Sequence, residues 1–291
     1  MILSNSLKNY LKLFFKIAVT VFCLWFVSKK IDWNESFIII RDSDFLWFSI
    51  AILLFVASKL VSAIRLNIYF RNIELMLSQQ SNIKLYCLGM FYNLFLPGGI
   101  GGDAYKVVVL KRKFPSLSAK KITAAVLLDR ISGVVGLGVL AIIYYYIIFK
   151  GNNFSLLLLF LIPAGFTVYY FIVKKIFPSF IKGFWPTLSL GIAVQLLQVF
   201  CVYAILKALD ISEHYTVYIL IFLLSSVVAI LPFTIGGLGA RELVFLWGSN
   251  TLLHIKNDPT PVSISITFYL VTLLVSLIGL YWLYKDPLKS L

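Results

Sequence analysis

Six long apolar runs dominate the sequence and restrict the chain to one kind of fold. They lie at about 10–28, 45–66, 120–149, 154–173, 184–207 and 262–284. Each is close to the roughly 20 residues that an α-helix needs to cross the hydrocarbon core of a bilayer. Hydrophobic residues make up 60% of the chain and charged residues only 13%, which is typical of a protein whose solvent is mostly lipid. We therefore predict an all-α, polytopic membrane helix bundle that forms a single transmembrane domain over residues 1–291, with no soluble domain.

Two shorter apolar segments are interrupted by proline and glycine, and the two interruptions read alike. Residues 96–102 are Leu-Pro-Gly-Gly-Ile-Gly-Gly, and residues 231–237 are Leu-Pro-Phe-Thr-Ile-Gly-Gly. A cation follows four residues after each motif, Lys106 in the first case and Arg241 in the second. For either motif alone, the end of one helix and the start of another explain the residues as well. A matched pair of broken helices is typical of inverted-repeat transporters, which bind polar substrates at membrane depth.

The broken segments, at about 83–112 and 215–254, are expected to form re-entrant hairpins. Irregular backbone at membrane depth is tolerated only inside protein or beside a wet cavity, so the spans should enclose both hairpin tips. A span, a hairpin and a span then make one repeat unit at about 45–149 and another at about 184–284. Because a single helix at 154–173 joins the units, the second is predicted to be inverted relative to the first.

Lysine and arginine are concentrated in the segments that this topology places in the cytoplasm, as the positive-inside rule requires. These cations are Lys8, Lys12, Arg65, Arg71, Lys84, Lys111, Arg112, Lys113, Lys120, Lys121, Lys174, Lys175, Lys182, Lys285 and Lys289. We predict a multi-pass protein of the cell (inner) membrane with both termini cytoplasmic. The net charge of +14 is explained by this orientation and by attraction to anionic headgroups, so no nucleic-acid partner is expected.

Five ionisable residues fall within the apolar stretches, where a charge near the bilayer centre costs roughly 2.5–3.5 kcal/mol. They are Lys59, Asp129, Arg130, Arg241 and Glu242. Asp129 and Arg130 project about 100° apart on a helix, so each needs a partner elsewhere. Pairing with Lys59 or Glu242 would lock the bundle, whereas contact with substrate or protons would give the charges a functional role, and both interpretations stay open. Close helix packing is predicted beside this pair, at Gly133, Gly136 and Gly138.

The second motif leads into a helix that should start near Ala240. Gly236, Gly237 and Gly239 leave backbone N–H groups free, and the positive end of the helix dipole points toward the loop. Such a helix start binds anions, phosphate in particular, and the guanidinium of Arg241 suits a phosphate or a carboxylate. Glu242, in the first turn, either stabilises the same dipole or exchanges protons.

In the first motif, Gly101 and Gly102 precede Asp103 at the position expected for a helix N-cap. The carboxylate of Asp103 would then accept hydrogen bonds from the first backbone N–H groups of the helix, with a headgroup or proton-coupling role as the alternative. Lys106 begins a basic helix that could collect anionic headgroups, although a topology signal explains its charge equally well.

Three neutral polar side chains also lie at membrane depth. They are Asn93, Gln195 and Gln198. Hydrogen bonds between helices are a sufficient explanation for them.

The usual motifs for catalysis, metal binding and nucleotide binding are absent from the sequence. There is no G-x-S-x-G elbow, no P-loop and no glycine-rich dinucleotide loop after a strand. The two histidines, His214 and His254, are not in a metal-ligand spacing. We therefore expect no catalytic residue, no metal site and no cofactor, which favours a transporter over an enzyme.

The same residues carry a resemblance to a known family. They are the segment Asn93-x-x-Leu96-Pro97-Gly98-Gly99-x-Gly101-Gly102-Asp103-x-x-Lys106, the pair Asp129-Arg130, and Gly236-Gly237-x-Gly239-x-Arg241-Glu242. Over nearly the whole chain the sequence resembles the lysylphosphatidylglycerol synthase transmembrane region family of flippase-like membrane proteins. In the larger relatives, the multiple peptide resistance factors, a membrane flippase portion precedes a cytosolic domain that transfers an aminoacyl group from tRNA to phosphatidylglycerol. The resemblance implies the translocation half without the transferase half.

We therefore predict a lipid translocase that moves a phosphate-bearing lipid, such as an aminoacylated phospholipid or a polyprenyl-phosphate-linked sugar, between leaflets. The expected headgroup contacts are Arg241, Arg130, Lys106, Gly101, Gly102, Gly236, Gly237, Gly239 and Asn93. The residues expected to couple charge or to contact a cationic headgroup are Asp103, Asp129, Glu242 and Lys59.

Two alternative functions remain open at this point. One is a membrane enzyme of lipid modification, acting in lysyl transfer to phosphatidylglycerol or in lipid-linked glycosyl transfer. The other is a non-transporting partner of a separate synthetase or glycosyltransferase. The sequence predicts no oligomeric state.

Overall fold

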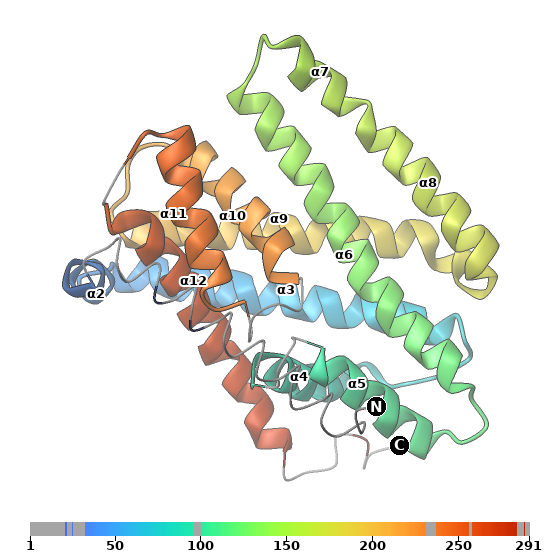
Figure 1. Ribbon diagram of the computed structural model, residues 1–291. Coiled ribbons are helices and arrows are strands. Elements are labelled where there is room, and N and C mark those ends of the chain that lie inside the picture. The colour runs from blue at the N-terminus through green and yellow to red at the C-terminus, as the bar shows by residue number, and fades with distance from the viewer. Residues whose placement is uncertain are drawn as a thin grey trace, which may run out of the picture.

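The computed structural model describes residues 21, 25, 33–95, 100–230, 237–255, 258–283 and 288, and all regular secondary structure in them is helical (Figure 1). The longer helices are α3 (Phe45–Arg71), α6 (Ala119–Ile148), α8 (Leu161–Ile176), α9 (Phe184–Ala208) and α12 (Thr260–Leu277). The shorter helices are α2 (Trp33–Arg41), α4 (Gln79–Phe95), α5 (Gly101–Lys113), α7 (Asn153–Leu159), α10 (Tyr215–Ile230) and α11 (Ala240–Leu252). The described residues also form two 3-10 helices, η1 (Pro178–Gly183) and η2 (Ile278–Trp282). The predicted all-α bundle is confirmed.

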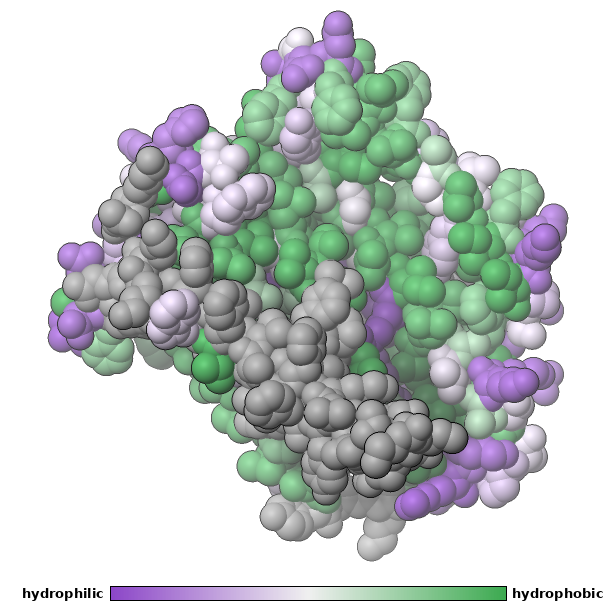
Figure 2. Space-filling view, in the orientation of Figure 1, coloured by the Kyte–Doolittle hydropathy of each residue, from purple (hydrophilic) through white to green (hydrophobic). Residues whose placement is uncertain are grey.

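Among the residues that the structure describes, five helical segments are long and apolar enough to cross a membrane. They are Phe45–Arg71, Ala119–Ile148, Asn153–Ile176, Pro178–Ala208 and Thr260–Trp282, and they coincide with the predicted apolar runs except the one at 10–28, most of which lies outside the described residues. Large apolar side chains on these segments face outward, as at Leu53 (68% exposed) and Phe160 (67%). In Figure 2, hydrophilic residues gather at the upper left and lower right margins, with a hydrophobic band between them. The described part of the chain is a multi-pass membrane bundle.

A side-chain cap sets the start of α3, and burial against other helices sets its end. The carboxylate of Asp44 accepts hydrogen bonds from two backbone N–H groups of the first turn, at 2.7 and 3.0 Å, so the helix begins at Phe45. The apolar run ends near residue 66, but the helix continues to Arg71 because aromatic residues beyond the run, such as Phe70 (0% exposed), are buried. Arg65 therefore lies inside a helix and not in a loop.

Two pairs of shorter helices form the predicted hairpins, α4 against α5 and α10 against α11. The four helices have 17, 13, 16 and 13 residues, so at 1.5 Å per residue they are about 20–26 Å long. A hydrocarbon core is roughly 30 Å thick, so the described part of each leg is too short to cross it upright. Both tips, at 96–99 and 231–236, lie outside the described residues.

Two hydrophobic clusters show at which end of the bundle each hairpin enters. One cluster joins Phe70 near the end of α3, Leu85 of α4, Leu110 of α5 and Ile122 near the start of α6. We term this the cationic end, because basic residues occupy the helix ends that meet there. They lie at 111–113 in the last turn of α5, at 120–121 in the first turn of α6 and at 174–175 in the last turn of α8. The other cluster joins the end of α9 with the starts of α10 and α12 and with Phe245 of α11. The α4–α5 hairpin therefore enters at the cationic end, and the α10–α11 hairpin enters at the opposite end.

Helix contacts within the first predicted unit have counterparts in the second. The contacts α3–α4, α4–α5 and α5–α6 correspond to α9–α10, α10–α11 and α11–α12. Between the units, α3–α12 corresponds to α6–α9 and α4–α12 to α6–α10, while α3 and α9 pack directly together. Two units related by a two-fold axis would produce this pattern, and the bounds of the units at 45–149 and 184–284 stay a prediction.

Helices α6 and α9 approach closely where both carry glycine. A Cβ on Gly136 would lie 2.8 Å from the carbonyl oxygen of Gly191, and a Cβ on Gly191 would lie 2.6 Å from the carbonyl oxygen of Ser132. Neither position has room for a side chain, as the prediction of close packing on α6 requires. Gly138 differs, because nothing lies within 4 Å of the Cβ position there.

Candidate functional site

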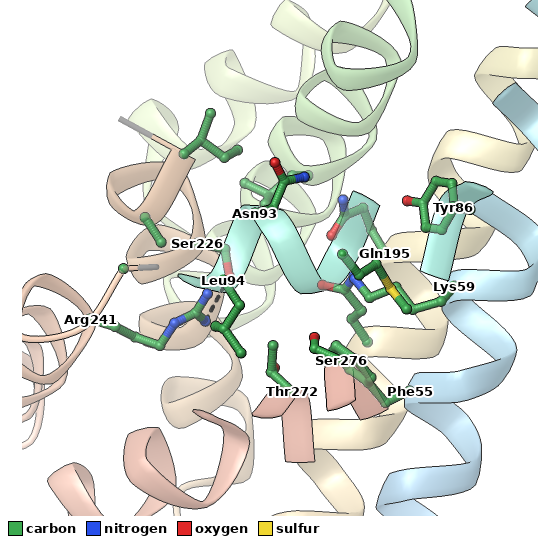
Figure 3. A pocket seen from close by; sticks show the side chains of 16 residues that line it. Phe55, Lys59, Tyr86, Asn93, Leu94, Gln195, Ser226, Arg241, Thr272 and Ser276 are labelled. Atoms are coloured by element: carbon green, nitrogen blue, oxygen red, sulfur yellow. Dashed lines mark hydrogen bonds between the residues drawn. The ribbon is translucent and has the colours of Figure 1, made fainter. Parts of the chain in front are cut away.

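A cavity of about 330 Å³, here termed the central cavity, lies where the two hairpins face one another (Figure 3). The end of α4 contributes Asn93, and the second hairpin contributes Ser226 and Arg241. The spans contribute Lys59 from α3 and Gln195 from α9. The volume falls in the range of small-molecule sites, and both units and both hairpins supply part of the wall.

The turn before α11 is built from two glycines and closed by Glu242. Gly237 and Gly239 have φ angles of 82° and 80°, which residues with a side chain rarely adopt. The carboxylate of Glu242 accepts hydrogen bonds from the backbone N–H of Gly239 (2.7 Å) and from the hydroxyl of Ser265 on α12 (3.0 Å). Both carboxylate oxygens are occupied and the residue is 1% exposed. Of the two roles expected for Glu242, these contacts favour helix stabilisation.

We expect Glu242→Ala to lower the free energy of unfolding by about 1–2 kcal/mol, because the helix loses its cap. Glu242→Gln keeps an oxygen for the N–H of Gly239 and should lose less than half as much. Thermal unfolding of the purified protein in detergent measures both. Equal losses in the two variants would show that the negative charge matters more than the hydrogen-bond geometry.

Arg241, at the start of α11, extends into the central cavity (Figure 3). Its Nη1 donates a hydrogen bond to the hydroxyl of Ser226 on α10 at 3.2 Å. The guanidinium carbon lies 5.3 Å from the ring centroid of Phe222 and 4.8 Å from that of Phe268. A hydroxyl and two ring faces thus hold the cation in place.

Lys59 approaches the cavity from α3, on the opposite side from Arg241 (Figure 3). Its ammonium lies 4.4 Å from the ring centroid of Phe55. In the part of the chain that the structure describes, neither cation has a carboxylate oxygen within 4 Å, and no Asp or Glu lines the cavity. The central cavity is therefore a positively charged site, and the described residues place neutral groups against both of its cations.

The expectation that Asp103 is an N-cap is wrong. Helix α5 starts two residues earlier, at Gly101. Its N-cap residue is Ile100, whose side chain cannot accept a hydrogen bond from the first turn. The carboxylate of Asp103 instead binds Lys106 (Nζ–Oδ1 3.1 Å) and Nε of Arg130 on α6. The backbone N–H of Gly102 donates to Oδ1 of Asn93 at 2.8 Å, so a side chain from the other leg of the hairpin satisfies this helix start. Two of the three cations expected at the headgroup, Lys106 and Arg130, therefore share one carboxylate.

Arg65, which the topology placed in the cytoplasm, is a buried residue that pairs with Asp129. The Nε–Oδ1 distance is 2.7 Å, and the two side chains are 5% and 9% exposed. Neither Lys59 nor Glu242, the partners considered from the sequence, forms this pair. The contact joins α3 to α6, so Asp129 has a structural partner in the folded bundle.

Gln195 lines the central cavity, although only a hydrogen bond between helices was expected of it. Its Nε2 donates to the carbonyl oxygen of Gly133 on α6 at 3.1 Å, as the interhelical explanation expects. Its Oε1 is buried and has no partner among the described residues. Gln195 and Gln198 both line the cavity, and their spacing of three residues on one face of an apolar helix was the available signal.

The structure divides the predicted site residues into separate groups. Those at the central cavity are Lys59, Asn93, Gly237 and Arg241. Those in ion pairs or caps elsewhere are Lys106, Asp103, Arg130, Asp129 and Glu242. Gly101 and Gly102 begin α5, Gly239 lies in the turn before α11, and Gly236 lies outside the described residues.

Comparison with known proteins agrees with this architecture. The UPF0104 membrane protein PH1989 of Pyrococcus horikoshii is 27% identical over 130 residues, which are 44% of this chain and 38% of that protein. The family described as Lysylphosphatidylglycerol synthase TM region matches residues 13–183 and 174–279, which together cover most of the chain and confirm the resemblance. The chain therefore belongs to the lysylphosphatidylglycerol synthase transmembrane region family.

Proposed function

We propose that this chain is a lipid translocase that moves a phosphate-bearing lipid between the two leaflets of its membrane. Membership of the family supports a membrane role in lipid metabolism. The observation that supports lipid translocation in particular is the central cavity. Lys59 and Arg241 both line it, and the described lining residues include no carboxylate. A buried cationic cavity suits an anionic headgroup, because the guanidinium fork and the ammonium both bind phosphate oxygens.

The headgroup contacts are assigned to Arg241 and Lys59 in place of Arg130 and Lys106. The latter two share the carboxylate of Asp103, which leaves less of their charge available to a ligand. Asn93 and the glycine turn at Gly237 complete the wall and supply neutral donors.

The two hairpins suggest a route for the headgroup. Because α4–α5 enters at the cationic end and α10–α11 at the opposite end, one hairpin stands between the cavity and each side of the membrane. A rocking motion of one unit against the other would open the cavity to each leaflet in turn. The acyl chains would stay in the bilayer, beside the apolar outer surface of the spans.

We expect Arg241→Ala and Lys59→Ala each to slow leaflet exchange of fluorescent phosphate-bearing lipids by about tenfold or more. Each variant removes a charged hydrogen-bonding group worth about 1.5–3 kcal/mol to a bound anion, and 1.36 kcal/mol corresponds to a tenfold change in rate. The assay uses proteoliposomes at matched protein density, with and without ion gradients.

Arg112→Ala is the matched control for this assay. Arg112 is exposed near the end of α5, away from the cavity, and its loss should leave exchange within about twofold of the native rate. A native chain that moves no lipid under any gradient, or an Arg241→Ala variant as fast as the native chain, would refute the translocase proposal.

A further inference from the structure

We propose that the central cavity selects a lipid with a dianionic headgroup, a phosphate monoester, over an aminoacylated phospholipid. The inference rests on the proposed function and narrows its substrate class.

Both cavity cations keep their charge for a ligand. Arg241 contacts the hydroxyl of Ser226 at 3.2 Å and two ring faces at 4.8 and 5.3 Å, and Lys59 contacts one ring face at 4.4 Å. A hydroxyl or a ring face positions a cation without neutralising it. The cavity therefore presents two positive charges to whatever enters it.

The carboxylates within the described spans and hairpins are already engaged. Asp103 binds two cations, Asp129 binds an arginine, and Glu242 accepts from a backbone N–H and a hydroxyl. The hairpin tips at 96–99 and 231–236 contain no acidic residue in sequence. The ammonium groups of a lysyl headgroup would thus meet two like charges and no available carboxylate among the described residues of the spans and hairpins, which disfavours binding.

A monoester matches the cavity better than a diester. A phosphate monoester carries about −1.5 to −2 charges at pH 7 and three terminal oxygens, whereas a phosphodiester carries a single charge on two such oxygens. Two cations in one cavity can therefore balance both charges of a monoester, whereas a diester leaves one of the cations uncompensated. Neutral side-chain amides in the wall, those of Asn93 and Gln195, can donate hydrogen bonds to the remaining oxygens.

The test compares three lipid probes against the full chain in phosphatidylcholine nanodiscs. They are phosphatidic acid as the monoester, phosphatidylglycerol as the diester, and lysylphosphatidylglycerol as the aminoacylated lipid. We expect phosphatidic acid to bind about tenfold more tightly than phosphatidylglycerol, and lysylphosphatidylglycerol to bind most weakly. Arg241→Met and Lys59→Met should each reduce the tenfold preference to about threefold or less, since one of the two charges is gone.

Charge reversal gives a sharper arm of the same experiment. Lys59→Glu places a carboxylate in the cavity, so it should weaken phosphatidic acid and strengthen lysylphosphatidylglycerol by at least about threefold each. Lys150→Glu is the matched control, because Lys150 is exposed just beyond α6 and its reversal should leave the ratio unchanged. If Lys59→Glu does not elute as a folded protein, the loss of preference in Lys59→Met is the test.

The outcomes separate this inference from the proposed function. Preferred binding of lysylphosphatidylglycerol by the native chain overturns the inference, and leaflet exchange of that lipid would leave the translocase proposal intact. Selective binding of phosphatidic acid without exchange of any lipid supports the inference and overturns the translocase proposal. Inorganic phosphate that competes as well as phosphatidic acid at equal concentration assigns the cavity to free phosphate and overturns a lipid ligand.

Discussion

Asp129→Asn is expected to lower the free energy of unfolding by about 3–5 kcal/mol, because breaking a buried ion pair leaves one charge uncompensated. The Nε of Arg65 lies 2.7 Å from Oδ1 of Asp129, and the side chains are 5% and 9% exposed. Nη1 of Arg65 already lacks a partner among the described residues, so no second acceptor stands ready to take the charge. Denaturant unfolding of the protein in detergent, followed by tryptophan fluorescence, measures the loss.

Two further variants test whether the burial of the ion pair, and not the loss of a charge by itself, causes the expected loss of stability. Asp42→Asn removes a similar contact, 2.8 Å between Nε of Arg41 and Oδ1, but the side chains there are 63% and 58% exposed. Unfolding should therefore be nearly unchanged. The double variant Arg65→Leu with Asp129→Leu should recover most of the stability, since an apolar pair replaces both charges. A double variant no more stable than Asp129→Asn would contradict this explanation.

Gly102→Ala is expected to produce the second large loss, about 3 kcal/mol, at the high end of the cost of overpacking. A Cβ on Gly102 would lie 1.8 Å from the carbonyl oxygen of Gly89 on α4. A backbone oxygen cannot turn aside, so α4 and α5 would have to separate. Separation would also break the 2.8 Å hydrogen bond from Gly102 to Asn93, a residue of the cavity wall. Stability and lipid binding should therefore fall together.

Gly138→Ala is the matched control for this substitution. Nothing lies within 4 Å of the Cβ position of Gly138 on α6, and alanine favours the helical backbone by about 1 kcal/mol over glycine. Its stability should equal or exceed that of the native chain. A Gly102→Ala protein as stable as Gly138→Ala would mean that the two hairpin legs do not approach as closely as described.

The spans could be predicted because hydrocarbon imposes one length and one composition on each of them. The hairpins could be predicted because proline and paired glycines interrupt apolar segments at corresponding places. The boundary of α3 could not be predicted in this way. Hydropathy averages composition, so it ends the span near residue 66 and does not register that Phe70 is buried in a contact with other helices. Arg65 was assigned to the wrong environment for that reason.

The candidate site was predictable only in part, because a sequence shows which charges lie in apolar runs but not which groups they contact. A charge in an apolar run is conspicuous, which identified Lys59 and Arg241, but its partner depends on which helix faces meet. Asp129 lies 64 residues from Arg65 in sequence, and no periodicity within one helix connects them. Asp103 was misassigned because the group that satisfies the start of α5 comes from Asn93 on the neighbouring helix, a contact that a cap motif cannot show.

The distance in sequence between Arg65 and its partner Asp129 has a consequence for biosynthesis. Because Asp129 follows 64 residues later, α3 enters the membrane before the carboxylate partner of Arg65 has been made. Arg65 lies six residues before the end of α3 at Arg71, about 9 Å along the axis, so its long side chain can extend to the headgroups in the meantime. Once α6 is in place, pairing with Asp129 would hold the guanidinium inside the bundle. The two helices are then joined in an order that translation sets.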